Sequence, residues 1–155
     1  MNREALFRLT HGMYLLTAHT VTDNGCIVDA VMQITAEPEQ ILVGVQKKSL
    51  THDMIVKQGH FCLSPLTEVV PDEIIARFGF SSGRDRRKFD DTEGFERGAF
   101  SLMYPTFASA ALFCRVTQSA DYKTHTLFTA EVEDSILLSQ APIMTYNSYR
   151  DRYMK

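Results

Sequence analysis

Basic side chains are concentrated in one short segment, FSSGRDRRKF, at residues 80–89. Four of the chain's 16 lysines and arginines lie between Arg84 and Lys88. Gly83 lets the backbone approach an anion closely, and the planar guanidinium of Arg84 matches phosphate oxygens. A run of charges is also typical of a loop that only faces solvent. The segment therefore predicts either an anion-binding loop or an exposed charged surface.

A second group of basic and hydroxyl residues stands where a strand gives way to a helix, in VQKKSLTHD at residues 45–53. Ser49 occupies the position of an N-cap. The free N–H groups of a helix start can bind phosphate, and Lys47, Lys48 and Thr51 would reinforce such a site. A capped helix with exposed lysines is the alternative. Two candidate anion sites in one chain favour a ligand that carries phosphate.

Two further residues could act on a ligand. His125 opens the last long apolar run after a turn-like stretch, where an imidazole could donate to a cofactor or a nicotinamide. A surface histidine satisfied by its neighbours is the alternative. Asp29 interrupts the apolar run 27–31, and a carboxylate there needs either solvent or partners. An outward-facing strand residue would meet that need without any function.

The totals describe an ordinary globular chain. Its 155 residues fit one domain, 1–155, and 45% hydrophobic with 23% charged residues match a protein that buries a core. A formal net charge of -3 argues against general nucleic-acid binding. No GxSxG, HExxH, Walker A or Rossmann glycine motif occurs, so hydrolase, zincin and P-loop interpretations lose support.

Cysteine usage and hydropathy bear on location. Cys26, Cys62 and Cys114 are odd in number and widely spaced, which suits neither a disulfide framework nor a zinc site. We expect them to be reduced, with Cys26 packed in the core. No apolar stretch approaches the roughly 20 residues that span a bilayer, and charged residues interrupt the start of the chain where a signal peptide would be apolar. We expect a cytoplasmic protein without a membrane span.

Hydrophobic periodicity and turn signals predict the elements that position these residues. Strands are expected at 13–21, 26–35, 41–46, 61–66, 111–122 and 125–138, and short helices at 3–11, 50–58 and 71–78. Turns are expected at TDNG (22–25) and AEPEQ (36–40), while Gly59 ends a helix and Pro71 begins one. Residues 79–109 form a long irregular loop, which at that length is more often functional than idle.

The order of these elements indicates the fold class. About six strands are joined mostly by turns, and the helices are too few to cross over between every pair of strands. The pattern therefore favours a mainly β, antiparallel barrel with a few short helices over a βαβ fold.

Several motifs, taken in order, resemble the flavin reductase-like family, whose FMN-binding split barrel is a homodimer. They are LFRLTHGMYLLTA, NGCIVDAVMQITAEP, VGVQKKSLTHDMI, FGFSSGRDRRKF, THTLFTAEVED and PIMTY. The resemblance runs almost from end to end and is greatest to the branch that includes flavoredoxin and the flavin domain fused to rubredoxin. It implies an FMN-binding split β-barrel, with FMN or FAD as cofactor and NADH or NADPH as donor.

The resemblance also implies roles for individual segments. The strand at 26–33 would pass the isoalloxazine ring, the turn at 46–52 would hold the ribityl phosphate, and the loop at 82–89 would help to close over the flavin. His125 matches the family's histidine near flavin and nicotinamide. The implied cofactor contacts are Val28, Asp29, Ala30, Val31, Lys47, Lys48, Ser49, Thr51, Gly83, Arg84 and Lys88, the last two as anion ligands.

Some positions depart from the family's pattern. Asp29 and Ala30 stand where the family more often has Asn followed by Thr or Ser, Gln46 stands at the usual Asn, and Lys123 with Thr124 replaces a Gly-Asp pair. A carboxylate near the ring would disfavour the reduced, anionic flavin and lower its potential, unless it is protonated or turned away from the ring.

Three functions follow as hypotheses. The first is an FMN-binding oxidoreductase that passes electrons from NAD(P)H or a protein donor to a flavin, a metal complex or a redox partner such as rubredoxin. The second is a non-enzymatic FMN electron carrier, and the third is a dimer that binds no cofactor. A homodimer is expected on geometric grounds, because a small barrel whose side chains fill its interior has little room for flavin.

Overall fold

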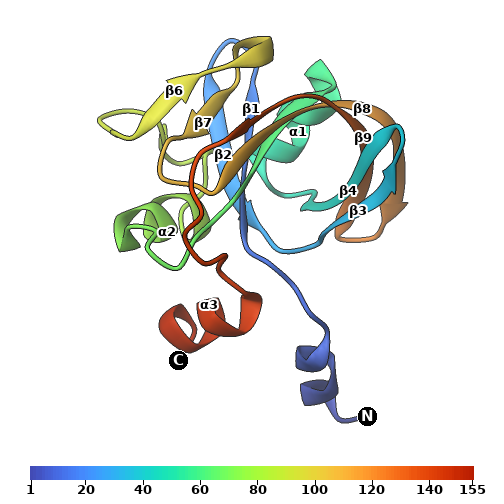
Figure 1. Cartoon of the computed structure of the whole chain (residues 1–155), viewed down its shortest axis with the longest axis vertical. Helices are drawn as coiled ribbons and strands as arrows, with labels where there is room; N and C mark the ends of the chain where they lie inside the picture. The colour runs from blue at the N-terminus through green and yellow to red at the C-terminus, as the bar shows by residue number, and fades with distance from the viewer.

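The computed structural model describes the chain from Met1 to Lys155 and is built on one large sheet (Figure 1). The strands are β1 (Tyr14–His19), β2 (Asp23–Val28), β3 (Val31–Ala36), β4 (Glu39–Gln46), β5 (His60–Pro65), β6 (Phe95–Arg97), β7 (Met103–Pro105), β8 (Ala110–Tyr122) and β9 (His125–Leu137). The helices are η1 (Arg3–Arg8), α1 (Leu50–Gln58), α2 (Asp72–Gly79), η2 (Ala99–Ser101) and α3 (Tyr146–Tyr153), η marking 3-10 helices.

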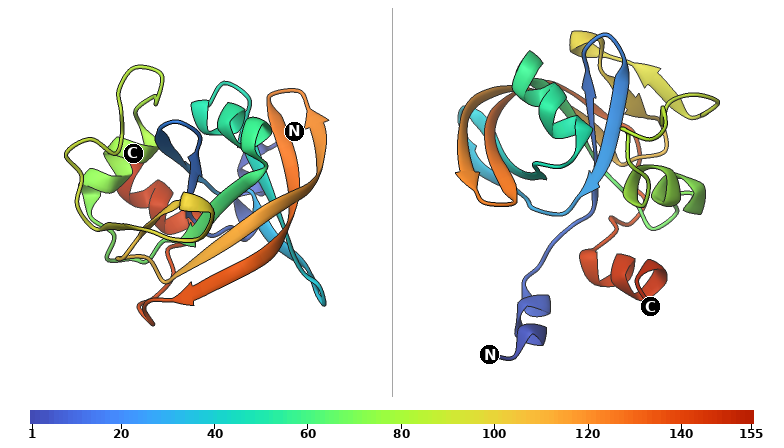
Figure 2. Two further views of the ribbon diagram at one scale, coloured as in Figure 1. Left: turned by 90° about the horizontal axis from the view of Figure 1, so that it is seen from above. Right: turned by 180° about the vertical axis from the view of Figure 1, so that it is seen from behind.

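Seven strands form the main sheet in the order β2-β1-β5-β8-β9-β4-β3, and every pairing is antiparallel. The sheet curls into a barrel, and the long, curved hairpin of β8 and β9 forms one side of it (Figure 2). A small second sheet pairs β6 with β7. The prediction of a mainly β antiparallel barrel is confirmed.

The two edges of the main sheet are consecutive in the chain. β2 and β3 are joined only by Asp29 and Ala30, and the N–H of Gly44 in β4 donates to the carbonyl of Ala30 at 2.8 Å. A Cβ on Gly44 would lie 3.0 Å from that of Ala30, so a larger residue in β4 would press on the connection. The chain thus passes from one edge of the sheet to the other at Asp29.

This connection corrects two expectations. The single strand predicted at 26–35 is divided at Asp29, because its halves pair with different neighbours, β1 and β4. The turn predicted at 22–25 is wrong, since Asn24 and Gly25 lie inside β2 opposite Ala18 and Thr17. Asn24 is 2% exposed and held by tertiary contacts, which outweigh its local turn preference. The hairpin itself is confirmed, with its turn at 20–22.

Helix boundaries follow the expected capping signals. Ser49 caps α1, and Gly59, with φ of 73°, ends it as predicted. Pro71 is the N-cap of α2 and not its first residue, so that helix begins one position later than expected. The predicted helix at 3–11 is the shorter 3-10 helix η1. The loop at 79–109 contains β6, η2 and β7, and the C-terminal helix α3 is an addition to the prediction.

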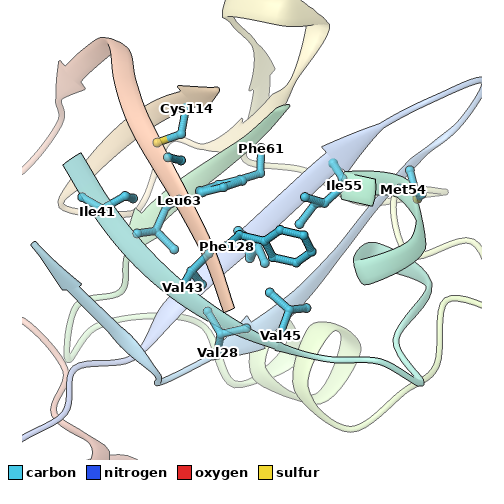
Figure 3. Close-up of a cluster of buried hydrophobic side chains, with 13 residues drawn as sticks. Val28, Ile41, Val43, Val45, Met54, Ile55, Phe61, Leu63, Cys114 and Phe128 are labelled. Carbon is cyan, nitrogen blue, oxygen red and sulfur yellow. The ribbon is translucent and has the colours of Figure 1, made fainter. Parts of the chain in front are cut away.

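Three hydrophobic clusters hold these elements together, and the smallest of them, of five buried residues around Phe113, packs β7 against β5 and β8. The first, of 13 buried residues, fills the barrel between strand side chains and one face of α1 (Figure 3). Phe61, Phe128 and Val43 lie at its centre and are at most 2% exposed. The second, of nine buried residues, packs α2 and α3 against the outside of β1, with Phe78 and Tyr149 among its members. α2 and α3 are therefore fixed beside the barrel.

The cysteines are free, as expected. Cys62 and Cys114 are fully buried, and desolvation raises the pKa of the Cys62 thiol to about 12. No helix of the structure has the length and apolar composition needed to cross a bilayer.

Candidate functional site

One pocket of about 550 Å³ opens beside the barrel, within the range of about 300–1,000 Å³ typical of ligand sites. Its walls come from β2, β4, the start of α1, the end of α2, the loop after it and the start of β9. The lining residues are Cys26, Ile27, Val28, Asp29, Gly44, Gln46, Lys48, Ser49, Leu50, Phe78, Gly79, Phe80, Ser81, Ser82, Gly83, Lys88 and His125. The pocket brings both candidate anion sites together.

The first wall is the free edge of β2. This strand pairs with β1 alone, so the backbone donors and acceptors on its other side have no strand partner. Ile27, Val28 and Asp29 place this edge along the pocket. Such an edge can hydrogen-bond a flat, polar ring at its rim.

The second wall is the N-terminus of α1. The Ser49 hydroxyl accepts from the N–H of Thr51 at 3.2 Å, and Lys48, Ser49 and Leu50 line the pocket. The other N–H groups of the first turn have no intrahelical partner, and the helix dipole favours an anion there. Lys47 is directed elsewhere, into an ion pair with Asp121.

The loop after α2 is fitted closely against β2. A Cβ on Gly83 would lie 2.3 Å from Oδ1 of Asn24, so any larger residue would force the loop or Asn24 to shift. Nδ2 of Asn24 donates to the hydroxyl of the fully buried Thr51 at 2.9 Å. The contact therefore links the loop, β2 and α1 behind the pocket.

The two predicted anion ligands of this loop differ in their surroundings. Nη2 of Arg84 lies 2.6 Å from Oδ2 of Asp53, and its Nε donates to the carbonyl of Lys48 at 3.1 Å. The hydrogen bond from Arg84, together with a second one from His52, holds the pKa of Asp53 below its ordinary value. Arg84 does not line the pocket and instead ties the loop to α1.

Lys88 does line the pocket but is only 2% exposed. Its Nζ donates to the carbonyls of Gly25 at 2.8 Å and Phe78 at 3.3 Å, and burial lowers the pKa of this ammonium. No carboxylate pairs with it. Lys88 therefore fastens the loop to β2 and α2 while adding a positive charge to the wall.

The mouth of the pocket carries His125 and Asp29. His125 stands opposite Gln46 at the start of β9, and its Nδ1 lies 2.8 Å from the hydroxyl of Thr124. Oδ2 of Asp29 lies 3.6 Å from Nδ1 of His11, and the Asp29 side chain is 41% exposed. Both residues therefore have a polar neighbour within the chain and still line the pocket.

The structure divides the predicted site residues into two groups. Val28, Asp29, Lys48, Ser49, Gly83, Lys88 and His125 line the pocket, whereas Ala30, Val31, Lys47, Thr51 and Arg84 lie outside its lining. Their roles in binding stay predictions. Sequence reasoning did not select Phe78, Phe80 or Asn24. Aromatic residues at the end of a helix usually pack in the core, and an Asn-Gly pair usually forms a turn.

Cys26 also lines the pocket and is half-buried, where we had expected it in the core. It packs against the barrel cluster on its other side. Desolvation raises the pKa of its thiol, which keeps it protonated at neutral pH.

Comparisons with known proteins agree with this architecture. A family model, the flavin reductase like domain, matches residues 6–155. A ferric-chelate reductase (NAD(P)H) from Archaeoglobus fulgidus is 34% identical over 151 residues, which are 96% of this chain and 89% of the relative. A high molecular weight rubredoxin from Moorella thermoacetica is 36% identical over 151 residues, 96% of this chain but only 66% of that longer relative.

Among solved structures, an NADH:FAD oxidoreductase from Streptomyces globisporus, in complex with NAD and FAD fragments, superposes with a TM-score of 0.80. The match covers 93% of this chain and 87% of that chain at 20% identity, so it shows the same fold. The family model and the two sequence relatives confirm the expected resemblance: this chain belongs to the flavin reductase-like family.

Proposed function

We propose that this protein is an FMN-binding oxidoreductase, which moves electrons from NADH or NADPH to a flavin, a ferric chelate or a redox protein. The observation that carries the proposal is the pocket itself, which combines the free edge of β2 with the N-terminus of α1. FMN needs both features, because it has a flat hydrogen-bonding ring at one end and a phosphate dianion at the other. The printed names of the relatives, a reductase and a rubredoxin, support the same chemistry.

The residues present fit this cofactor. Ser49, Lys48 and the first N–H groups of α1 would hold the phosphate, and the backbone of β2 from Ile27 to Asp29 would hold the ring. Gly83 lets the loop that lines the pocket pack directly against Asn24 of β2. When bound, the flavin supplies a hydride acceptor at N5 and a store of two electrons. FAD would use the same contacts through its FMN half.

His125 would act at the mouth of the pocket. Its Nδ1 is engaged with the hydroxyl of Thr124, which leaves Nε2 to hydrogen-bond a flavin or nicotinamide. The rest of the chain orients these groups: Lys88 holds the loop down, and Arg84 ties it to α1.

A second candidate is a carrier whose bound flavin receives electrons only from another protein. The relationship to a high molecular weight rubredoxin favours it, since this chain matches about two thirds of that protein, 66%. A redox protein such as rubredoxin would then be the partner. The rate of reduction by nicotinamides separates the carrier from the reductase.

We infer that the working form is a homodimer. Leu6 and Leu9 in and after η1 are more than half exposed, as is Met32 on β3. η1 lies apart from the barrel near the N-terminus (Figure 1), and none of its residues is buried, although the Phe7 ring packs on Arg150 of α3. Burying them against a second copy would supply the missing contacts. Light scattering tests this, and a monomer with FMN bound would reject it. A cytoplasmic location stays a prediction.

The deciding experiment is a visible spectrum of the purified protein with FMN, followed by anaerobic NADH and then NADPH. Bleaching of the bound flavin within seconds would support the reductase. A flavin that stays oxidised with nicotinamides but is reduced by a protein donor would support the carrier. Failure to bind FMN in a fluorescence titration would favour the cofactor-free dimer and reject both.

A further inference from the structure

Phe80 is a feature of the pocket that flavin binding as proposed above does not use. This aromatic side chain is 58% exposed, although it lines the pocket. The flavin contacts proposed above come from β2, the start of α1 and the loop from Gly83 onward, whereas Phe80 is the C-cap of α2. The apolar surface of an exposed ring is in contact with water, and a ligand that covers the ring would remove that surface from water and be stabilised by it.

The back of the Phe80 ring is supported by the protein. Tyr149 of α3 lies nearly parallel to it, with an interplanar angle of 6° and ring centroids 6.3 Å apart. Tyr149 is itself 6% exposed and belongs to the cluster that fixes α2 and α3 beside the barrel. The Tyr149 hydroxyl also lies beside Gly79, the last residue of α2, at ordinary van der Waals distance from the position of a Cβ there.

The backbone at Phe80 is equally well held. Its N–H donates to the carbonyl of Ala76 at 3.2 Å as the C-cap of α2, and the hydroxyl of Ser81 donates to the same carbonyl at 3.2 Å. Ser81 and Ser82 also line the pocket beside the ring. The result is a flat apolar surface with polar groups at its rim, suited to a planar heteroaromatic ring.

We propose that Phe80, backed by Tyr149, is the stacking platform for a ring of the nicotinamide cofactor during electron transfer to the flavin. This inference rests on the proposed function and adds to it the residue that binds the donor. Phe80 is a binding residue, and Tyr149 positions it. Both rings of the dinucleotide, nicotinamide and adenine, have the required chemistry, so the test distinguishes them.

The test uses Phe80→Leu, which keeps an apolar side chain but removes the ring, with Phe80→Tyr as the variant that keeps it. Phe100→Leu is the matched control, because Phe100 is 43% exposed but packs on His60, outside the pocket lining. Each FMN-loaded protein is mixed anaerobically with increasing NADH, or with reduced nicotinamide mononucleotide, which lacks adenine. The rate of flavin bleaching gives the apparent Kd of each donor.

We expect Phe80→Leu to raise the apparent Kd for NADH roughly 5- to 100-fold, as loss of one base stack does, with the Kd for FMN unchanged. Phe80→Tyr and Phe100→Leu should stay near wild type. If the variant weakens the binding of both donors equally, the nicotinamide ring stacks on Phe80. If it weakens the binding of NADH alone, the adenine ring stacks there.

Three results would overturn the platform. One is an apparent donor Kd that Phe80→Leu leaves unchanged. Another is weaker FMN binding with normal donor binding, which would mean that the Phe80 side chain contacts the flavin. A third is a change of mass in light scattering, which would place Phe80 in a contact between copies. A wild-type protein that binds no FMN, or that no nicotinamide reduces, would reject the reductase function itself and the platform with it.

Discussion

The interior of the barrel and the pocket beside it share β2 and β4 but are held by different forces. The interior cluster is built from apolar side chains of the strands, such as Val43, Phe61 and Phe128 (Figure 3). The pocket is bounded by the unpaired edge of β2 and by charged or hydroxyl residues such as Lys48 and Lys88. The comparison teaches that apolar packing in the barrel fixes the strands beside which the pocket lies. Hydrogen bonds and ion pairs then hold the loop and the helix end that form its other walls.

The largest effect should come from the interior. Phe61→Ala is expected to lower the free energy of unfolding by about 3–5 kcal/mol, because it removes a fully buried ring and leaves a cavity. Phe100→Ala, at an exposed ring, should cost far less. Urea unfolding of both variants measures the difference. Similar losses in the two would show that the barrel cluster is not the main source of stability.

Gly83→Ala should damage the pocket more than the fold. The new Cβ would meet the Asn24 side chain at 2.3 Å, so the loop must shift, at a cost of about 1–3 kcal/mol. We expect FMN affinity to fall about tenfold or more, the fold-change equivalent of about 1.4 kcal/mol. Fluorescence titration measures it, with Asp85→Ala, at an exposed position of the same loop outside the pocket lining, as the control. Unchanged affinity would mean that the loop does not touch the cofactor.

Lys88→Met should leave the carbonyls of Gly25 and Phe78 without their donor, at a cost of about 1–3 kcal/mol. Burial lowers the pKa of Lys88 below its ordinary 10.5, so the folded state holds this proton less tightly than the unfolded state. Wild type should therefore gain stability relative to Lys88→Met as pH rises toward 10.5. Urea midpoints of both proteins across that range provide the test, and a constant difference would contradict it.

Asp29→Asn should sharpen the electrostatic side of the comparison. Removing a carboxylate from the mouth of the pocket favours the reduced, anionic flavin, so the potential of bound FMN should rise by about 30–60 mV, equivalent to roughly 1.4–3 kcal/mol for two electrons. Asp85→Asn, which is exposed outside the pocket lining, is the control. Equilibrium dye titration reports both. A shift equal to that of Asp85→Asn would mean that Asp29 is turned away from the ring.

Arg84→Gln should have the smallest effect. Its ion pair with Asp53 is about half exposed on both sides, and such pairs contribute about 0–1 kcal/mol. The pair lowers the pKa of Asp53, so its contribution is present above the ordinary Asp pKa and is lost as pH falls below it. Urea unfolding at neutral and acidic pH, with the Asp53→Asn variant and the double variant, measures the coupling. A coupling above about 2 kcal/mol would contradict a surface role.

Much of the fold could be predicted from local signals. Ser49 and Gly59 gave the limits of α1 because capping depends on a few adjacent residues. The turn predicted at Asn24 and Gly25 failed for the opposite reason. Both residues pair with β1, and Asn24 is held by Thr51, which is distant in sequence.

The candidate site was predicted only in part. Residue types indicated that anions would be bound near Lys48 and Lys88, and both line the pocket. The same reasoning could not tell that the two basic residues have different partners. Arg84 pairs with the carboxylate of Asp53, whereas the ammonium of Lys88 donates to backbone carbonyls. Phe80 escaped notice because the exposure of a ring depends on what surrounds it, which residue type does not record.

By itself, the sequence determined the class of fold, the caps of α1 and the concentration of basic groups in two segments, since these depend on composition and near neighbours. Only the tertiary structure decided that the two segments meet in one pocket and that β2 has a free edge there. It also decided which charges are already paired. The physical reason is that strand order and ion pairing are set by contacts between residues far apart in the chain, whose energies no local pattern contains.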